Sequence, residues 1–325
     1  MAKKALITGV TGQDGAYLAQ FLLNKGYEVF GLVRRAVNRN FENLEYLGIE
    51  NKIDLVDGDL TDEASLINAV KRIYPDEIYN LAAQSFVGTS WDQPVVTCEI
   101  NGMGVLKLLN AIKICCPTTK FYQASTSEMF GNVNTNDTQG EETPFHPRSP
   151  YAISKLFAYW ITINYRESNN MFCSNGILFN HESPIRGKEF VSRKITDGVA
   201  RIKLGLAKEI RLGNLDSRRD WGFAGDYVEA MWLMLQQKNP NDFIISTGKT
   251  NSIRDFLNLA FKCVGINDWQ PYVKIDPRYK RPAELFTLQG KNNKAKKILN
   301  WKPKVSFEEL VKMMVVADLK RLSKN

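Results

Sequence analysis

The stretch "KKALITGVTGQDGAYLAQFLLNKGYEVFGLVRR", residues 3–35, predicts the fold of this chain. It contains an apolar run, a glycine-rich turn, an amphipathic stretch with helical periodicity and a second apolar run, in that order. This is the strand–helix–strand unit that opens a dinucleotide-binding sheet. Gly9, Gly12 and Gly15 fall in the turn, where glycines let backbone N–H groups approach a pyrophosphate at the start of a helix. We therefore expect a dinucleotide site here, with a purely structural turn as the alternative.

The same alternation continues along the chain. Strand-like runs recur at residues 52–60, 77–83, 120–126 and 173–179, and helix-like stretches such as 62–74 and 104–116 separate them. This order predicts an α/β fold with a right-handed, doubly wound parallel sheet of the Rossmann type. The nearly continuous apolar character of the strands fits burial on both faces.

A second lobe is expected after about residue 181, where the pattern changes to a loop-rich stretch and then to the Trp/Arg-rich "DSRRDWGFAGD". The helix-like stretch 226–237 and the strand-like stretch 242–248 have the character of core elements. The chain should therefore return to the large domain there, before a final lobe from about residue 250. We therefore predict a dinucleotide-binding domain at 1–180 with a return of about 223–247. A smaller, interleaved substrate lobe would comprise 181–222 and 248–325.

Composition excludes several classes of protein. Hydrophobic residues make up 44% of the 325 and charged residues 24%, an ordinary globular balance. No uninterrupted apolar run reaches the ~18 residues of a membrane span, so we expect a soluble, cytoplasmic protein without a membrane partner. The net charge of +8 could indicate nucleic acid, but the basic residues are scattered, and small anionic ligands explain part of the excess. Five cysteines without a CxxC pair, and two histidines, predict reduced core thiols and no metal site.

The end of the second strand favours one cofactor over another. Arg34 and Arg35 stand where an NAD-specific protein would more often carry an acidic residue for the ribose hydroxyls. Arginines suit a 2′-phosphate, so NADP is preferred, with a solvated charged loop as the alternative. Asp59, in "DGDL", could accept a hydrogen bond from the adenine amino group. The full set predicted for the cofactor from these segments is Gly9, Thr11, Gly12, Gln13, Asp14, Gly15, Arg34, Arg35, Asp59, Leu60, Leu81, Ala82 and Ala83.

Two further motifs indicate a reacting centre. "YAISK" places Tyr151 and Lys155 four residues apart, hence on one face of a helix. A cationic Lys155 would lower the pKa of the Tyr151 phenol and make it a plausible base at a sugar hydroxyl. Tyr-x-x-x-Lys pairs are common and usually structural. Upstream, "STSEMFG" places the hydroxyl of Thr126 and the carboxylate of Glu128 at the end of a predicted strand.

The combination of TGxxGxxG, "NLAA", a strand that ends in Ser and Thr, and YxxxK resembles the extended short-chain dehydrogenase/reductase superfamily, which modifies nucleotide sugars. Longer signatures narrow the resemblance to the GDP-mannose 4,6-dehydratase family. They include "ILFNHESP" (177–184), "RDWGFAGDYVEAMWLMLQQ" (219–237) and "DPRYKRPAE" (276–284). The match runs almost from end to end.

The resemblance implies a three-stage reaction. Members of this family oxidise C4 of the hexose with tightly held NADP⁺, eliminate water across C5 and C6, and return the same hydride to C6. By this resemblance Tyr151 removes the C4 hydroxyl proton, Lys155 holds the nicotinamide ribose, and Thr126 hydrogen-bonds the O4 region. Oxidation acidifies the C5 proton, so Glu128 can remove it and then protonate the departing C6 hydroxyl.

The resemblance also implies roles for other positions. His181 and Arg186 would contact the cofactor, together with Tyr151 and Lys155. The GDP-sugar site would comprise Ser85, Thr126, Glu128, Asn180, Val191, Lys194, Gly213, Arg219, Arg281 and Glu284. Family members commonly assemble as dimers or tetramers, so we expect a homotetramer, with a dimer as the alternative.

Three other interpretations remain open from the sequence. The same dehydration could act on a GDP-manno-heptose, which differs only at C6. A 4-keto reductase or 4-epimerase would share the fold, the cofactor and the Tyr151/Lys155 pair, but it would not need Glu128. A non-catalytic NADP-binding or nucleic-acid-associated protein would need none of the four reacting residues.

Overall fold

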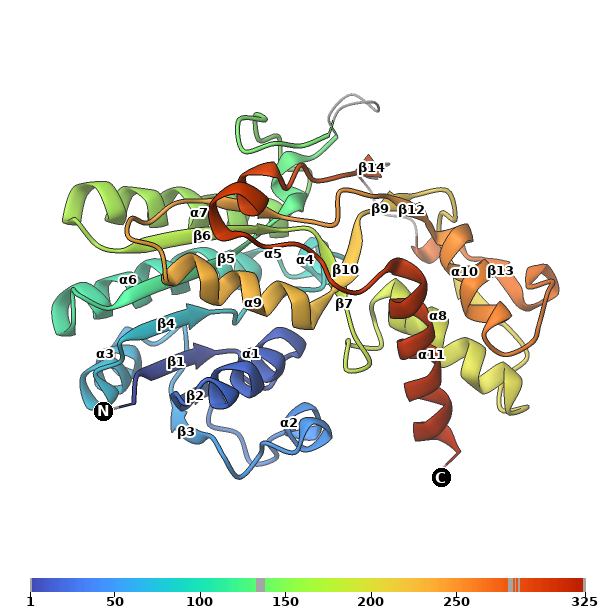
Figure 1. Ribbon diagram of the computed structural model, residues 1–325, viewed down its shortest axis with the longest axis horizontal. Coiled ribbons are helices and arrows are strands. Elements are labelled where there is room, and N and C mark those ends of the chain that lie inside the picture. The colour runs from blue at the N-terminus through green and yellow to red at the C-terminus, as the bar shows by residue number, and fades with distance from the viewer. Residues whose placement is uncertain (1, 133–137, 280–282, 284, 286, 324–325) are drawn as a thin grey trace.

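The structure is a computed structural model that describes residues 2–132, 138–279, 283, 285 and 287–323. A seven-stranded sheet lies at the centre of this described part, with strand order β11-β6-β5-β4-β1-β2-β3 (Figure 1). Its strands are β1 (Lys4–Thr8), β2 (Glu28–Val33), β3 (Asp54–Asp57), β4 (Glu77–Asn80), β5 (Lys120–Thr126), β6 (Cys173–Leu178) and β11 (Phe243–Ile245). Every neighbouring pair is parallel. The predicted doubly wound parallel sheet is confirmed.

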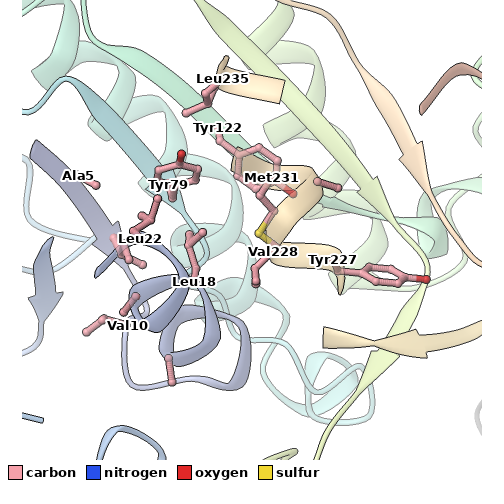
Figure 2. Packing of buried hydrophobic residues seen from close by; sticks show 14 of the residues in the cluster. Ala5, Val10, Leu18, Leu22, Tyr79, Tyr122, Tyr227, Val228, Met231 and Leu235 are labelled. Carbon is pink, nitrogen blue, oxygen red and sulfur yellow. The ribbon is translucent and has the colours of Figure 1, made fainter. Parts of the chain in front are cut away.

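Helices cover both faces of the sheet. One face packs against α1 (Gln13–Asn24) and α9 (Ala224–Leu235) through a buried apolar cluster, and α2 (Glu42–Leu47) packs against α1. Figure 2 shows part of this cluster, in which Leu18 and Leu22 of α1 lie near Val228 and Met231 of α9. The other face packs against α3 (Glu63–Ile73), α6 (Gly104–Cys115) and α7 (Pro150–Asn169). β11 pairs with β6 at the edge of this sheet, and α9 packs on the same face as α1.

One helical run is long and apolar enough to cross a membrane by length and composition. It spans Pro94–Cys115 and joins α5 (Pro94–Cys98), the π-helical turn η1 (Glu99–Met103) and α6. Half of its most apolar window is buried, and α6 packs between α3 and α7. This burial is typical of a core helix in a doubly wound fold.

The second lobe has its own apolar core and lies beside the sheet domain (Figure 1). Its helices are α8 (Val191–Lys203), α10 (Ile253–Lys262) and α11 (Phe307–Leu322), and its strands β8 (Ile210–Leu212) and β13 (Val273–Ile275) pair with each other. Short strands connect the lobes: β7 (Asn180–Glu182) pairs with β10 (Trp221–Phe223), and β9 (Arg218–Arg219) lies between β12 (Asn251–Ser252) and β14 (Thr287–Leu288). The other short elements are α4 (Thr89–Asp92), η2 (Ser127–Phe130), η3 (Gln270–Tyr272), η4 (Pro277–Tyr279) and η5 (Ala295–Leu299).

The cysteines are free thiols, as predicted, but not all of them are core residues. Cys116 and Cys173 are buried, Cys115 is half-buried, and Cys98 and Cys263 are exposed. The prediction was wrong for the last two, because Cys98 faces solvent within the helical run Pro94–Cys115 and Cys263 lies exposed just after α10. Among the described residues, no group of three or more His, Cys, Asp or Glu side chains could hold a metal ion.

Candidate active site

The glycine turn between β1 and α1 is too close to neighbouring backbone for any other residue. Gly9 has φ +69°, and a Cβ there would lie 2.8 Å from the amide nitrogen of Ala82. A Cβ on Gly15 would lie 2.2 Å from the carbonyl oxygen of Gly9. The first-turn N–H groups of a helix lack intrahelical acceptors, so the start of α1 at Gln13 can receive an anion. The turn therefore fits the pyrophosphate of a dinucleotide.

A chain of hydrogen bonds between buried polar side chains links this turn to the predicted catalytic lysine. The Thr8 hydroxyl donates to Asn80 Oδ1 at 2.6 Å, and Asn80 Nδ2 donates to Gln123 Oε1 at 2.8 Å. Gln123 Nε2 and Lys155 Nζ both donate to the carbonyl oxygen of Ala124, each at 3.0 Å. Thr8 and Asn80 end β1 and β4, and Gln123 and Ala124 lie in the second half of β5, so these strands fix the lysine relative to the cofactor turn.

Helix α7 carries the Tyr–Lys pair. Its start is fixed by Ser149, whose hydroxyl accepts from Ala152 N at 3.1 Å, and by Pro150 in the first turn. Tyr151 and Lys155 are buried, and α7 packs against β5 and η2. Tyr151 forms a side-chain hydrogen bond with Thr126 at the end of β5. The predicted pair therefore lies beside the predicted threonine.

The electrostatics of the pair correct one sequence prediction. Burial raises the pKa of Tyr151 to about 12, although the hydrogen bond from Thr126 acts to lower it. Burial lowers the pKa of Lys155 to about 8. The expectation that Lys155 lowers the Tyr151 pKa is wrong for the chain without ligands, because desolvation dominates and the ammonium donates to Ala124 O.

Replacing Lys155 with Met should stabilise the fold. A lysine with a pKa of about 8 when folded and about 10.5 when unfolded costs ~3 kcal/mol below pH 8, and Ala124 O would keep its bond from Gln123. The unfolded state binds more protons between these pKa values, so wild-type stability should rise across that window. Lys155→Met should lack this rise. Urea unfolding at neutral and high pH measures both effects; equal stability of the two proteins at neutral pH would contradict this expectation.

Glu128 lies in the short helix η2, directly after β5. Its backbone N–H donates to the Thr126 hydroxyl at 3.2 Å, so Thr126 is the N-cap of this turn. The side chain is half-buried. Thr126 thus bonds both to the Glu128 N–H and to the Tyr151 side chain, and the Glu128 charge acts to raise the pKa of Tyr151. The structure thus brings Thr126, Glu128, Tyr151 and Lys155 together.

A second charged group lies at the start of α1. His181 Nε2 is 2.6 Å from Asp14 Oδ2, and Gln13 Nε2 donates to Asp14 Oδ1 at 3.0 Å. Gln13 also accepts from Ser183 at 2.8 Å. The predicted cofactor residues Gln13 and Asp14 therefore hold the strand β7 that carries His181.

Arg186 follows β7 in a loop held by the C-terminal helix. Its guanidinium lies 3.6 Å over the ring centroid of Phe190, and its Nε is 3.1 Å from Glu182. The buried Arg193 of α8 donates to the Arg186 carbonyl at 2.9 Å and pairs with Asp318 of α11 at 2.8 Å. Through this pair α11 contributes to the position of the loop.

Other predicted cofactor residues lie beyond the ends of β2, β3 and β4. Arg34 and Arg35 are exposed beyond the end of β2. Asp59 uses Oδ1 to accept from Thr61 N at 2.9 Å and from Thr61 Oγ1 at 2.8 Å, so this oxygen already stabilises a turn. Leu60 is buried, and Leu81, Ala82 and Ala83 are half-buried where the chain leaves β4.

The predicted substrate residues come from the second lobe and its connections. The Lys194 ammonium lies 3.2 Å over the ring centroid of Tyr279, and a Cβ on Gly213 would lie 2.7 Å from Tyr279 O. Val191 begins α8, Asn180 begins β7, Arg219 is buried in β9, and Ser85 is exposed after β4. Lys194 and Gly213 therefore share one neighbourhood around Tyr279. Arg281 and Glu284 lie outside the described residues.

Sequence reasoning missed two residues of this region. Asn101 is buried in the π-helical turn η1, and its side chain bonds to both backbone groups of Gln84, at 2.8 and 3.0 Å. It also donates to Ser154, next to Lys155. A π-helical turn often marks a functional site, but an Asn–Gly pair inside a helical pattern gives no such signal. Tyr279 is the other, and only its place in "DPRYKRPAE" could have indicated it.

A Rossmann sheet, a glycine turn at its first helix and a Thr–Tyr–Lys set at its carboxyl edge define an extended short-chain dehydrogenase/reductase. The fold matches UDP-glucose 4-epimerase from Thermus thermophilus, solved with NAD, at 26% identity and TM-score 0.85, over 97% of this chain and 98% of the other. The family described as GDP-mannose 4,6 dehydratase matches residues 6–314. The chain is 54% identical to GDP-mannose 4,6 dehydratase 2 of Arabidopsis thaliana, over 98% of this chain and 87% of the relative. It is 50% identical to GDP-mannose 4,6 dehydratase of Homo sapiens, over 99% and 92% respectively. The chain belongs to the GDP-mannose 4,6-dehydratase family.

Proposed function

We propose that this chain converts GDP-D-mannose to GDP-4-keto-6-deoxy-D-mannose and that its cofactor is NADP. The observation that carries the proposal is the carboxylate of Glu128 in the same site as Tyr151 and Thr126. An epimerase or a keto reductase needs the hydroxyls and the lysine, but no such acid and base. The similarity to GDP-mannose dehydratases along almost the whole chain supports the substrate.

The residues of the site suit each proton transfer in the reaction. Bound NADP would accept hydride from C4 and return it to C6. Tyr151 takes the proton of the C4 hydroxyl, with Thr126 hydrogen-bonded to the phenol. The C4 ketone acidifies the C5 proton, which Glu128 removes. Glu128 then gives this proton to the C6 hydroxyl, so the C6–O bond breaks, water leaves and a C5–C6 double bond forms. When hydride returns to C6, C5 takes up one proton, which completes the 4-keto-6-deoxy sugar.

The product tests this function directly. Purified protein with GDP-mannose and NADP⁺ should give a sugar whose NMR spectrum shows a C6 methyl group and a C4 ketone or its hydrate. A C4-inverted sugar, or no turnover, would contradict the proposal. Comparison of kcat/KM on GDP-mannose and on a GDP-manno-heptose decides between hexose and heptose.

The cofactor proposal rests on the two arginines beyond β2. Their exposed guanidiniums suit a 2′-phosphate, which NAD lacks. Replacing both Arg34 and Arg35 with Ala should weaken NADP⁺ binding by roughly tenfold to hundredfold and NAD⁺ binding by much less. Fluorescence titration of the two nucleotides measures this. Equal losses for both, or tighter binding of NAD⁺ by the wild type, would contradict the NADP proposal.

We also propose that the chain is a homo-oligomer, a tetramer or a dimer, and that helix α7 contacts a second copy. Ile153, Phe157 and Trp160 follow helical spacing on one face of α7 and are 53%, 43% and 55% exposed. Val95 and Val96 of the contacting helix α5 are also exposed. Contiguous apolar side chains on a helix face favour association.

Trp160→Glu should therefore reduce the assembly, since it places a charge in an apolar contact. Light scattering after size-exclusion chromatography should show a multiple of the chain mass for the wild type and a smaller species for the variant. Glu167→Lys, an exposed charge change farther along α7, is the control. A wild type that elutes as a monomer would contradict the proposal.

The domain division at 1–180 and 223–247 against 181–222 and 248–325, and a cytoplasmic location, are also proposals. Cell fractionation tests the location.

A further inference from the structure

The proposed reaction assigns no proton transfer to the half-buried acid–imidazole pair of Asp14 and His181. Asp14 lies in the first turn of α1, where the glycine turn fits a pyrophosphate. An isolated carboxylate there would repel a phosphate group. The carboxylate instead meets His181 at 2.6 Å, and only 21% and 12% of the two side chains are exposed.

The hydrogen bonds of the pair fix its protons. His181 Nδ1 is 2.7 Å from the carbonyl oxygen of Phe179, which can only accept, so Nδ1 carries a proton. Gln13 donates to one oxygen of Asp14, and His181 Nε2 lies 2.6 Å from the other, so one proton is shared between the ring and the carboxyl group. With this proton on Nε2, the ring is doubly protonated and the carboxylate is ionised.

The surrounding charges agree with this assignment. Burial acts to lower the pKa of His181, but the charge and the hydrogen bond of Asp14 outweigh it and the pKa is raised. Burial likewise acts to raise the pKa of Asp14, yet its pKa is lowered, chiefly by His181. The positive charge of Arg186 also acts on both groups. The Asp14 charge acts in turn on Lys155 and Tyr151, and the ring of Tyr227 stacks on His181 with centroids 4.7 Å apart.

We propose that His181 is a fixed counter-cation for Asp14, so that the dinucleotide pyrophosphate meets a neutral pair at the start of α1. His181 belongs to β7, which pairs with β10 of the substrate-lobe connection, His181 opposite Gly222. The pair therefore also ties that connection to the cofactor turn. This role rests on the proposed function only in requiring a pyrophosphate-bearing cofactor.

Imidazole NMR tests the protonation state without any ligand. The chain has two histidines, and His146 is exposed, so it serves as an internal control. In ¹⁵N spectra at neutral pH both ring nitrogens of His181 should be protonated, and its pKa should lie above the ordinary histidine value. In Asp14→Asn the ring should become neutral with the proton on Nδ1, while the His146 signals do not move. A neutral His181 ring in the wild type at neutral pH would overturn the proposal.

Cofactor binding tests the consequence through a double-mutant cycle. His181→Asn keeps a donor for Phe179 O but leaves the Asp14 charge uncompensated, so NADP⁺ affinity should fall by roughly tenfold to hundredfold. Asp14→Asn should change affinity by less than about threefold, because an amide can donate to the neutral ring and the pair stays neutral. The double variant Asp14→Asn/His181→Asn should regain most of the affinity lost in His181→Asn.

If the double variant binds NADP⁺ as weakly as His181→Asn does, His181 acts by direct contact alone and the proposal is overturned. Thermal unfolding checks each variant, and His181→Gln replaces His181→Asn if that variant does not fold. Titrations use NADP⁺, or NAD⁺ if the wild type binds it more tightly. Because no sugar is present, failure of the proposed dehydration would leave this test intact, whereas failure of the wild type to bind either nucleotide would overturn both.

Discussion

Glu128→Gln should stop dehydration while C4 oxidation continues. The amide has nearly the shape of the carboxylate, so the turn η2 and the bond from the Glu128 N–H to Thr126 should persist. It cannot take the C5 proton or protonate the C6 hydroxyl. Loss of a positioned acid or base typically costs about 10²- to 10⁴-fold in rate, and here one side chain serves both transfers.

Two measurements separate the stages for this variant. Oxidation of bound GDP-mannose, followed by absorbance of the reduced nicotinamide in a single turnover, should remain near the wild-type rate. Exchange of solvent deuterium into C5 and formation of the C6 methyl should be lost. Glu142→Gln, an exposed carboxylate in the loop that follows η2, is the matched control and should behave as wild type. Normal turnover by Glu128→Gln would remove the assigned role.

Tyr151→Phe should be slow in C4 oxidation, the stage before the elimination that Glu128→Gln blocks. Without the phenol no group takes the C4 hydroxyl proton, so oxidation should slow by about 10²- to 10⁴-fold, and C5 exchange should fall with it because it needs the ketone. The two variants are therefore distinguishable by whether reduced nicotinamide accumulates. Tyr159→Phe, at a buried tyrosine two turns further along α7, is the control. Rapid oxidation by Tyr151→Phe would contradict the role of Tyr151 as base.

The pH dependence of oxidation follows from the same group. With a Tyr151 pKa of about 12, the phenolate fraction rises with pH, so the oxidation rate should increase by up to about tenfold per pH unit near neutrality. A rate independent of pH would contradict the assignment of Tyr151 as the base.

The sheet was predictable because its signals are local. Each strand is an apolar run ended by small or polar residues. In "GVTGQDG" the glycines are required because a Cβ at Gly9 or Gly15 would clash with neighbouring backbone atoms. The placement of Thr126, Tyr151 and Lys155 follows from helix spacing and strand order. The short strands β9, β10, β12 and β14, of two or three residues each, leave no periodicity to detect.

Properties that depend on the three-dimensional environment were not predictable. The Tyr151 pKa depends on burial, which motif spacing does not contain, so the expected effect of Lys155 was wrong. The Asp14–His181 contact joins residues 167 positions apart, and Asn101 acts through a helical turn of unusual geometry. Cys98 and Cys263 were misplaced because cysteine type alone does not report which side of a helix faces the core.

Transfer of an isotopic label within one sugar tests the central claim most directly. GDP-mannose carrying deuterium at C4, turned over by the wild-type protein with NADP, should give a 4-keto product with deuterium in its C6 methyl group. That result requires oxidation at C4, loss of water across C5 and C6, and return of the same hydride at C6. Product that keeps deuterium at C4, or a sugar without a C6 methyl group, would contradict the assignment of this chain as a 4,6-dehydratase.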